Sequence, residues 1–438
     1  MSSASAAVSD PGAAPPIPAA GIGRRPASRA SWALTALIGG IPIWWALGLG
    51  SLIWIIAAVP MGVRLLRRWP NRAPRGFGIW LMFVIWMMLS VSQVSGTRYL
   101  SFGYRALLYL AATVMFLYVY NLTEEELPRA KILKLAVVYF LWGAIGGYLG
   151  LILGETGFTS VMEMILPHSI TANEFAATMV HPTFAQTQDF LGFALPRPTA
   201  PFVFTNEWGS GMSLLFPFVM AAIAGLDRRW QAWATLALTA SLVPIVLSVN
   251  RGLWLNIGIA FAYGAVLLAM RGNPAYLRSL AAGAVLVALV VALPPMNSVV
   301  AGRFESDHSN NARLTLYGQV IDQVPQSPLF GFGAPVANEE NPNLPAVGTH
   351  GQLWTVLFSH GIPGALLFVA FAVSLAWRTT VYRDPVSTWL HVVVALVPLL
   401  MWFYELLAPP LFIWMLAGAA ALRGPPKRTP EGPSPVSL

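Results

Sequence analysis

Residues 352–377 read QLWTVLFSHGIPGALLFVAFAVSLAW and contain no aspartate, glutamate, lysine or arginine. A largely apolar stretch of about 20 residues is long enough to cross the hydrocarbon core of a bilayer as a helix. The rest of the chain continues this pattern, because 56% of its 438 residues are hydrophobic and only 10% are charged. A soluble domain carries about 25% charged residues. The composition therefore predicts a polytopic membrane protein and excludes a soluble globular domain.

Other apolar stretches of similar length predict further spans. We expect ten clear spans, at residues 77–95, 101–120, 132–153, 207–225, 232–249, 252–270, 279–299, 352–377, 386–404 and 408–422. The stretch 32–66 is too long for one span, and Gly48-Leu49-Gly50-Ser51 divides it into two. The predicted fold is therefore all-α, with about 12 transmembrane helices in one domain over residues 32–422. Residues 1–31 and 423–438 are rich in proline and carry basic residues, so we expect disordered cytosolic tails there.

The distribution of positive charge orients these spans. With the N-terminus in the cytosol, all but six of the 26 lysines and arginines fall on the cytosolic side, as the positive-inside rule requires. Two long loops, about 154–206 and 300–351, then lie outside the cytoplasm. This bias explains the net charge of +8 without a nucleic-acid partner. The chain has no cysteine, which excludes disulfides, thiolate metal sites and cysteine nucleophiles.

The exceptions to the charge rule are all arginines and point to an anionic ligand. They are Arg98, Arg105, Arg197, Arg251, Arg303 and Arg313. Guanidinium is a planar fork that matches the oxygens of phosphate or carboxylate. The alternatives are pairing with outer carboxylates such as Glu305 or Asp307 and, for Arg251 in its short turn between two spans, interfacial snorkelling. Asn206 and Glu207 lie where a span begins, so they either bind substrate or cap the helix.

The second outer loop shows internal order. Asn310-Asn311-Ala312 predicts the cap of a helix that begins near Arg313. An apolar face follows at helical spacing (Tyr317, Val320, Ile321, Val324), Pro325 and Pro328 end the helix, and Gly331-Phe332-Gly333 predicts a tight turn.

His350 is the candidate general base. Thr349 is expected to cap the span that begins at residue 352, which would place His350 at the positive end of that helix. This position would lower the pKa of the histidine and keep its ring neutral, as a general base requires. His391 lies within a span and is expected to be structural. No group of carboxylates or histidines has the spacing of a metal site, so we expect neither metal nor cofactor.

Four segments together resemble the O-antigen ligase / O-antigen polymerase superfamily of bacterial membrane proteins. They are Arg197 with Phe204-Thr205-Asn206-Glu207; Ser248-Val249-Asn250-Arg251-Gly252-Leu253-Trp254; Asn311-Ala312-Arg313 through Pro328-Leu329-Phe330-Gly331-Phe332-Gly333; and His350 through Gly361-Ile362-Pro363-Gly364. The resemblance covers about residues 197–365. The family usually has asparagine after the histidine, whereas Gly351 follows here.

This resemblance implies a C-type membrane glycosyltransferase fold, a site at the outer face of the bacterial inner membrane and a role in lipopolysaccharide or other envelope polysaccharide synthesis. The donor would be a glycan on undecaprenyl diphosphate, and the acceptor a lipid or another glycan. Transfer would be inverting and metal-independent. Arg251, Arg313, Arg197 and Arg303 would hold the diphosphate, with Asn206 and Glu207 nearby, and His350 would act on the acceptor hydroxyl.

Three alternatives to a ligase remain open at this stage. A polymerase would join lipid-linked repeat units by the same chemistry. A lipid-linked glycan transporter or flippase would couple transport to acidic groups in the membrane, yet the predicted spans hold no aspartate or glutamate away from their ends. A non-catalytic scaffold is the third.

Overall fold

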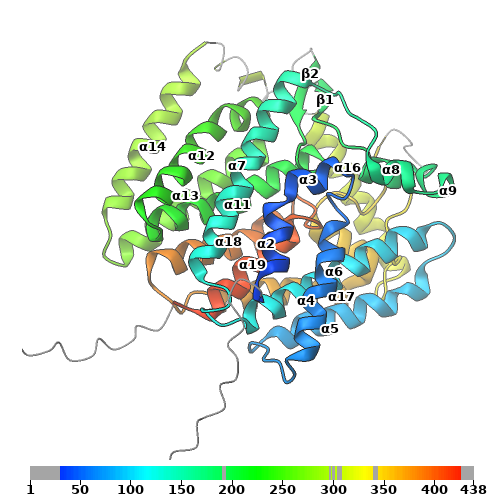
Figure 1. The fold of residues 1–438 in the computed structure, drawn as a ribbon. Helices are drawn as coiled ribbons and strands as arrows, with labels where there is room; N and C mark the ends of the chain where they lie inside the picture. Colours follow the sequence, from blue (N-terminus) through cyan, green and yellow to red (C-terminus); the bar gives the residue numbers. More distant parts are fainter. Residues whose placement is uncertain are drawn as a thin grey trace, which may run out of the picture.

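The chain forms a bundle of helices with small extra elements at one end (Figure 1). This computed structural model describes residues 30–189, 194–294, 297, 301–302, 308–338 and 344–425. Within this part of the chain, six helices are long and apolar enough to cross a membrane: α6 (Arg98–Asn121), α7 (Arg129–Leu153), α11 (Thr205–Gly225), α12 (Arg228–Leu247), α13 (Arg251–Met270) and α17 (Gln352–Arg378). The prediction of a mostly helical membrane protein is confirmed.

Shorter helices complete the bundle. They are α2 (Trp32–Gly39), α3 (Ile41–Ala46), α4 (Ile53–Arg67), α5 (Phe77–Leu89), α14 (Ala275–Ala292), α18 (Pro385–Leu400) and α19 (Pro410–Arg423). The chain leaves the helix between α3 and α4, at the predicted Gly48–Ser51 break, and is interrupted once more at Gly40. The total of 12 spans therefore stays a prediction. The two predicted tails lie almost entirely outside the described residues.

The loop 154–206 carries more structure than its sequence pattern indicated. Three short helices, α8 (Val161–Ile165), α9 (His168–Thr171) and α10 (Glu174–Val180), precede a β-hairpin. Its strands β1 (Ala185–Asp189) and β2 (Ala194–Pro198) are antiparallel, with Gln186 opposite Arg197. The all-α prediction is therefore corrected by one two-stranded hairpin. The sequence did not indicate it, because β1 lacks alternating apolar residues and the hairpin is defined by the pairing of its strands rather than by β propensity.

Glycines on α7 let this hairpin approach the bundle closely. A Cβ added at Gly146 would lie 1.9 Å from the carbonyl oxygen of Ala200, and one at Gly150 would lie 2.6 Å from that of Phe184. Small residues allow backbones to come together at membrane-helix interfaces. The glycine face of α7 therefore seats the end of β2 and with it Arg197.

A break in α17 receives the Gly331-Phe332-Gly333 turn. Gly361 leaves helical geometry at φ 69°, which frees the carbonyls of the preceding turn. The Phe332 and Gly333 amides donate to the carbonyl oxygens of Phe358 and Ser359, at 2.9 and 2.7 Å. Gly331 and Gly333 both have positive φ, so the predicted tight turn is confirmed. The Gly331-Phe332-Gly333 turn and the break at Gly361 thus hold the backbone of the second outer loop against that of α17.

Replacing Gly331 by alanine should destabilise the protein. Its φ of 62° costs a residue with a side chain about 1–2 kcal/mol, and the new Cβ would lie 2.3 Å from the carbonyl oxygen of Phe358. We expect a lower midpoint of thermal unfolding for Gly331→Ala, followed by tryptophan fluorescence in detergent. Gly318→Ala is the control, because Gly318 lies within α16 (His308–Gln323) with open space around its Cβ position. Equal midpoints for the two variants would contradict this view of the turn.

Candidate active site

Four side chains from four separate segments form a basic cluster, by which we mean Arg197, Arg313, His350 and Tyr404. The charge of Arg313 acts on each of the other three. Arg197 comes from β2, Arg313 from α16, His350 from the segment before α17, and Tyr404 from the segment between α18 and α19. The structure therefore brings together three of the residues that the sequence singled out.

Arg197 is held deep inside the cluster. Its side chain is only 5% exposed, and its Nε donates to the carbonyl oxygen of Ser248 at 3.1 Å. Its Nη1 also donates to Gln188 on the paired strand. Burial lowers the pKa of Arg197 to about 10, and the charge of Arg313 adds to this effect. Arg197 therefore remains a cation at neutral pH, held in a fixed orientation.

Tyr404 is a residue that the sequence analysis did not select. Burial raises its pKa to about 12, although the charges of Arg313 and Arg197 oppose the shift. The protonated hydroxyl donates to Asn250 Oδ1 at 2.6 Å. A Cβ added at Gly252 would lie 2.5 Å from the Tyr404 hydroxyl. Because Asn250 and Gly252 flank Arg251, these contacts place the start of α13, and so Arg251, beside the basic cluster.

The segment 401–409 also determines where α17 begins. The Gln352 amide donates to the Tyr404 carbonyl oxygen and the Leu353 amide to that of Met401, both at 2.8 Å. The predicted N-cap at Thr349 is therefore wrong: Gly351 occupies that position, and backbone carbonyls satisfy the first amides. The predicted span 386–404 is too long for the same reason, because α18 ends at Leu400 and the next residues turn toward α17.

Gly351 fits a backbone conformation that few other residues adopt. It has φ 85° and ψ 130°, and an added Cβ would lie 2.6 Å from the carbonyl oxygen of Trp402. Glycine alone reaches such a conformation without strain. This backbone conformation and the nearby Trp402 carbonyl explain why glycine, rather than the family's asparagine, follows His350.

The ring of His350 is oriented by the neighbouring Thr349. The Thr349 hydroxyl donates to the carbonyl oxygen of Ala346 at 2.6 Å, and its oxygen lies 3.1 Å from His350 Nδ1. Because that hydroxyl proton is already used, Nδ1 must donate, which leaves Nε2 without a proton. Burial, followed by the charge of Arg313, lowers the pKa of His350 to about 4. The predicted lowering is confirmed, but its cause is burial and Arg313.

Acidic and phenolic groups lie next to the basic cluster. Glu405 follows Tyr404 directly and forms an ion pair with the buried Arg105. The charges of Glu207, Arg105 and Glu405 act on the hydroxyl of Tyr104. Glu207 Oε2 accepts the Val203 and Phe204 amides at 3.3 and 3.4 Å. Glu207 thus takes the capping role, and its role in substrate binding stays a prediction, as does that of Asn206.

The remaining outer arginines differ from one another. Arg98 donates to the carbonyl oxygens of Phe332 and Ala334, so its role is to hold the glycine turn. Arg303 lies outside the described residues, as do Glu305 and Asp307. Arg313 does not begin a helix, because α16 is already helical from His308. The predicted cap at Asn310-Asn311-Ala312 is therefore wrong, since these residues lie within the helix.

Two other histidines have structural partners. His391 contacts the hydroxyls of Tyr263 and Thr379 through its two ring nitrogens, at 2.9 and 2.8 Å, so its structural role is confirmed. His360 Nδ1 lies 2.8 Å from the Ser90 hydroxyl in a buried position. Among the residues that the structure describes, no three acidic or histidine side chains gather as a metal site would require.

The apolar helices support a multi-pass membrane protein. Residues 202–369 match the family model of the O-antigen ligases, and this segment contains Arg251, Arg313 and His350. The match over this segment supports membership of the O-antigen ligase superfamily, which the resemblance predicted, and a role in lipopolysaccharide biosynthesis. The family implies a glycosyltransferase-like enzyme with lipid-linked glycan substrates. No curated protein matches the chain.

Proposed function

We propose that this protein transfers a glycan from a polyprenyl-diphosphate carrier to a lipid acceptor at the outer face of the bacterial inner membrane. The observation that supports this proposal best is the convergence of Arg197, Arg313 and His350 around Tyr404. Two neighbouring cations suit a diphosphate, and a neutral histidine close to Arg313 suits an acceptor hydroxyl. Arg251, at the adjacent helix start, and Arg303 are proposed as further ligands of the diphosphate.

The proposed reaction is one displacement at the anomeric carbon. The acceptor oxygen forms a bond to that carbon, and its proton passes to His350 Nε2. The bond between the sugar and the diphosphate breaks, and the carrier leaves as its diphosphate. Fixed arginines stabilise the charge that develops on the leaving group, because they need no rearrangement during the step. Attack from the face opposite the leaving group would invert the configuration, and no step in this scheme needs a metal ion.

Purified protein in detergent tests the proposal directly. A polyprenyl-diphosphate-linked glycan and a lipid acceptor are incubated with it, and the product is followed by its mobility on a gel. A transferase needs no gradient or second compartment, whereas a transporter forms no product under these conditions. Glycan joined to the lipid acceptor is the expected result. Lengthened carrier-linked chains would instead identify a polymerase. If glycan is joined neither to the lipid acceptor nor to another carrier-linked chain, the transfer proposal is rejected.

The proposed orientation can be tested by labelling single cysteines, because the chain has none of its own. Ser169 in α9 and Thr380 after α17 are both exposed, and the two lie on opposite sides in the proposed orientation. We expect an impermeant maleimide to label Ser169→Cys in intact spheroplasts and Thr380→Cys only after permeabilisation. The reverse pattern would move the proposed site to the cytosol.

A further inference from the structure

A positively charged cavity lies far from the candidate active site. Figure 1 shows β1, β2 and α16 toward the top of the bundle and the turn between α4 and α5 at the opposite end. A cavity of about 640 Å³ opens beside α4 at that lower end. Its lining includes Trp32, Val59 and Val63, the arginines Arg64, Arg67 and Arg68, and Glu126.

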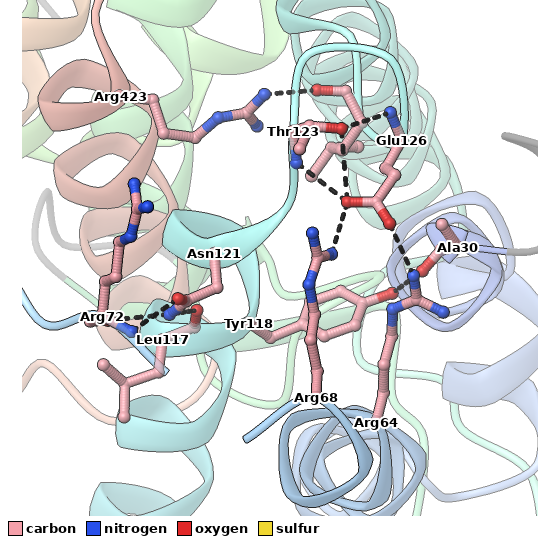
Figure 2. A network of polar contacts seen from close by, with 11 residues as sticks. Ala30, Arg64, Arg68, Arg72, Leu117, Tyr118, Asn121, Thr123, Glu126 and Arg423 are labelled. Atoms are coloured by element: carbon pink, nitrogen blue, oxygen red, sulfur yellow. Dashed lines mark hydrogen bonds and ion pairs between the residues drawn. The ribbon is translucent and has the colours of Figure 1, made fainter. Parts of the chain in front are cut away.

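The charges in this cavity do not cancel. Figure 2 shows Arg64 of α4 and Arg68, just after its end, reaching to the single carboxylate of Glu126. The nitrogen–oxygen distances are 2.9 and 2.5 Å. Burial acts to raise the pKa of Glu126, but the Arg68 hydrogen bond, the Thr123 amide and the two arginine charges outweigh it and leave the pKa lowered. Three arginines therefore face one carboxylate. Arg67 has no ion pair with any described residue, and Arg64 Nε is buried without a hydrogen bond.

One side of the cavity is apolar and exposed. Trp32 is 55% exposed, and Val59 and Val63 are also exposed beside the arginines. Trp32 also lines a neighbouring cavity of about 550 Å³ along α2, which includes Trp44 and Lys131. Tryptophan and basic residues at a helix end are typical of the membrane interface. A headgroup-sized basic cavity thus continues into apolar surface that could accept acyl chains.

From this arrangement we propose that the cavity binds the phosphate of an anionic glycerophospholipid. The arginines at the end of α4 hold the phosphate, and the chains lie along Trp32, Val59 and Val63. Basic pockets between membrane helices on the cytoplasmic side are suited to anionic headgroups. The Glu126 network keeps Arg64 and Arg68 in place, so Arg67 supplies the uncompensated charge. The lipid would join α2 and α4 to the turn between α6 and α7.

Native mass spectrometry of the full chain in detergent tests this site. Phosphatidylglycerol is the probe, phosphatidylcholine is the lipid without net headgroup charge, and inorganic phosphate is the competitor. One basic residue near an anionic headgroup contributes about fivefold in affinity. We therefore expect Arg67→Gln to weaken phosphatidylglycerol binding about fivefold. Arg229→Gln is the control, because Arg229 is an exposed arginine at the start of α12 and outside the cavity.

A cavity-filling variant separates this site from general attraction between charges. Val63→Trp keeps every arginine but occupies the apolar wall, so it should also weaken binding. Equal binding of the two lipids would overturn the proposal, as would equal effects of Arg67→Gln and Arg229→Gln. Displacement of the lipid by millimolar inorganic phosphate would show a site for free phosphate instead. Lipid binding is measured without glycan substrates. Absence of lipid binding would therefore leave the transferase proposal unaffected, and absence of glycan transfer would leave the lipid-site proposal unaffected.

Discussion

Arg313→Ala should reduce glycan transfer by about 10³-fold or more, because removing a preorganised cation from a transition state has effects of this size. Arg313 is the residue whose charge acts on Arg197, Tyr404 and His350 together. Its loss would remove a ligand of the diphosphate from the centre of the cluster. Initial transfer rates per folded protein, measured in detergent, give the result. Arg251→Ala is expected to have a comparable effect.

Two further variants give this prediction its controls. Arg313→Lys should recover little activity, because an ammonium group lacks the planar fork that contacts two phosphate oxygens. Arg229→Ala removes an exposed arginine outside the site and should leave the rate unchanged. Full activity in Arg313→Ala, with the protein folded and inserted, would rule out the proposed role of Arg313.

His350→Ala should lower turnover by about 10²–10⁴-fold, the usual contribution of a general base. Donor binding should survive, because the proposed ligands of the diphosphate are the arginines. His168→Ala replaces an exposed histidine in α9 and should have no effect. His360→Ala should affect folding more than turnover, because His360 is buried against Ser90. Equal rates for wild type and His350→Ala would remove this histidine from the mechanism.

The pH dependence gives an independent measure of the same base. The pKa of His350 is lowered to about 4, so its ring is neutral above that pH. The rate at low donor concentration should therefore stay constant as the pH falls through 6.5 and decline only near pH 4. In Arg313→Lys the positive charge remains, so the decline should stay near pH 4. In Arg313→Ala the residual activity should decline at a higher pH, because one cause of the lowered pKa is gone.

Excess EDTA tests the proposed absence of a metal requirement. Wild-type transfer should proceed at the same rate with and without the chelator, since in the proposed scheme arginines rather than a divalent cation balance the diphosphate. Loss of activity in EDTA that added Mg²⁺ restores would contradict this part of the proposal.

Several features were open to prediction because they depend on local chemistry. An uncharged apolar run such as 352–377 predicts a membrane helix wherever it occurs. Arg197, Arg251 and Arg313 stood out because each breaks the charge rule on the outer side, and His350 because it precedes a span. These inferences needed only the composition, the spacing and the side of the membrane.

The site's assembly, in contrast, depends on contacts between distant segments. Tyr404 was counted at the end of a span, yet its carbonyl oxygen caps α17 and the charges of Arg313 and Arg197 both act on its hydroxyl. The Leu406 amide likewise donates to Gln352, 54 residues away. Such backbone contacts leave no periodic signal in either segment.

The sequence alone thus determined the class of protein, the main spans and most of the candidate residues, because hydrophobicity and charge act residue by residue. Only the tertiary structure decided which of those residues meet. The glycines of α7 seat β2 and Arg197 by close backbone approach, and the 401–409 segment holds Asn250 and the start of α17 by long-range hydrogen bonds. Packing and pairing across the chain are properties of the folded bundle, so no local pattern could reveal them.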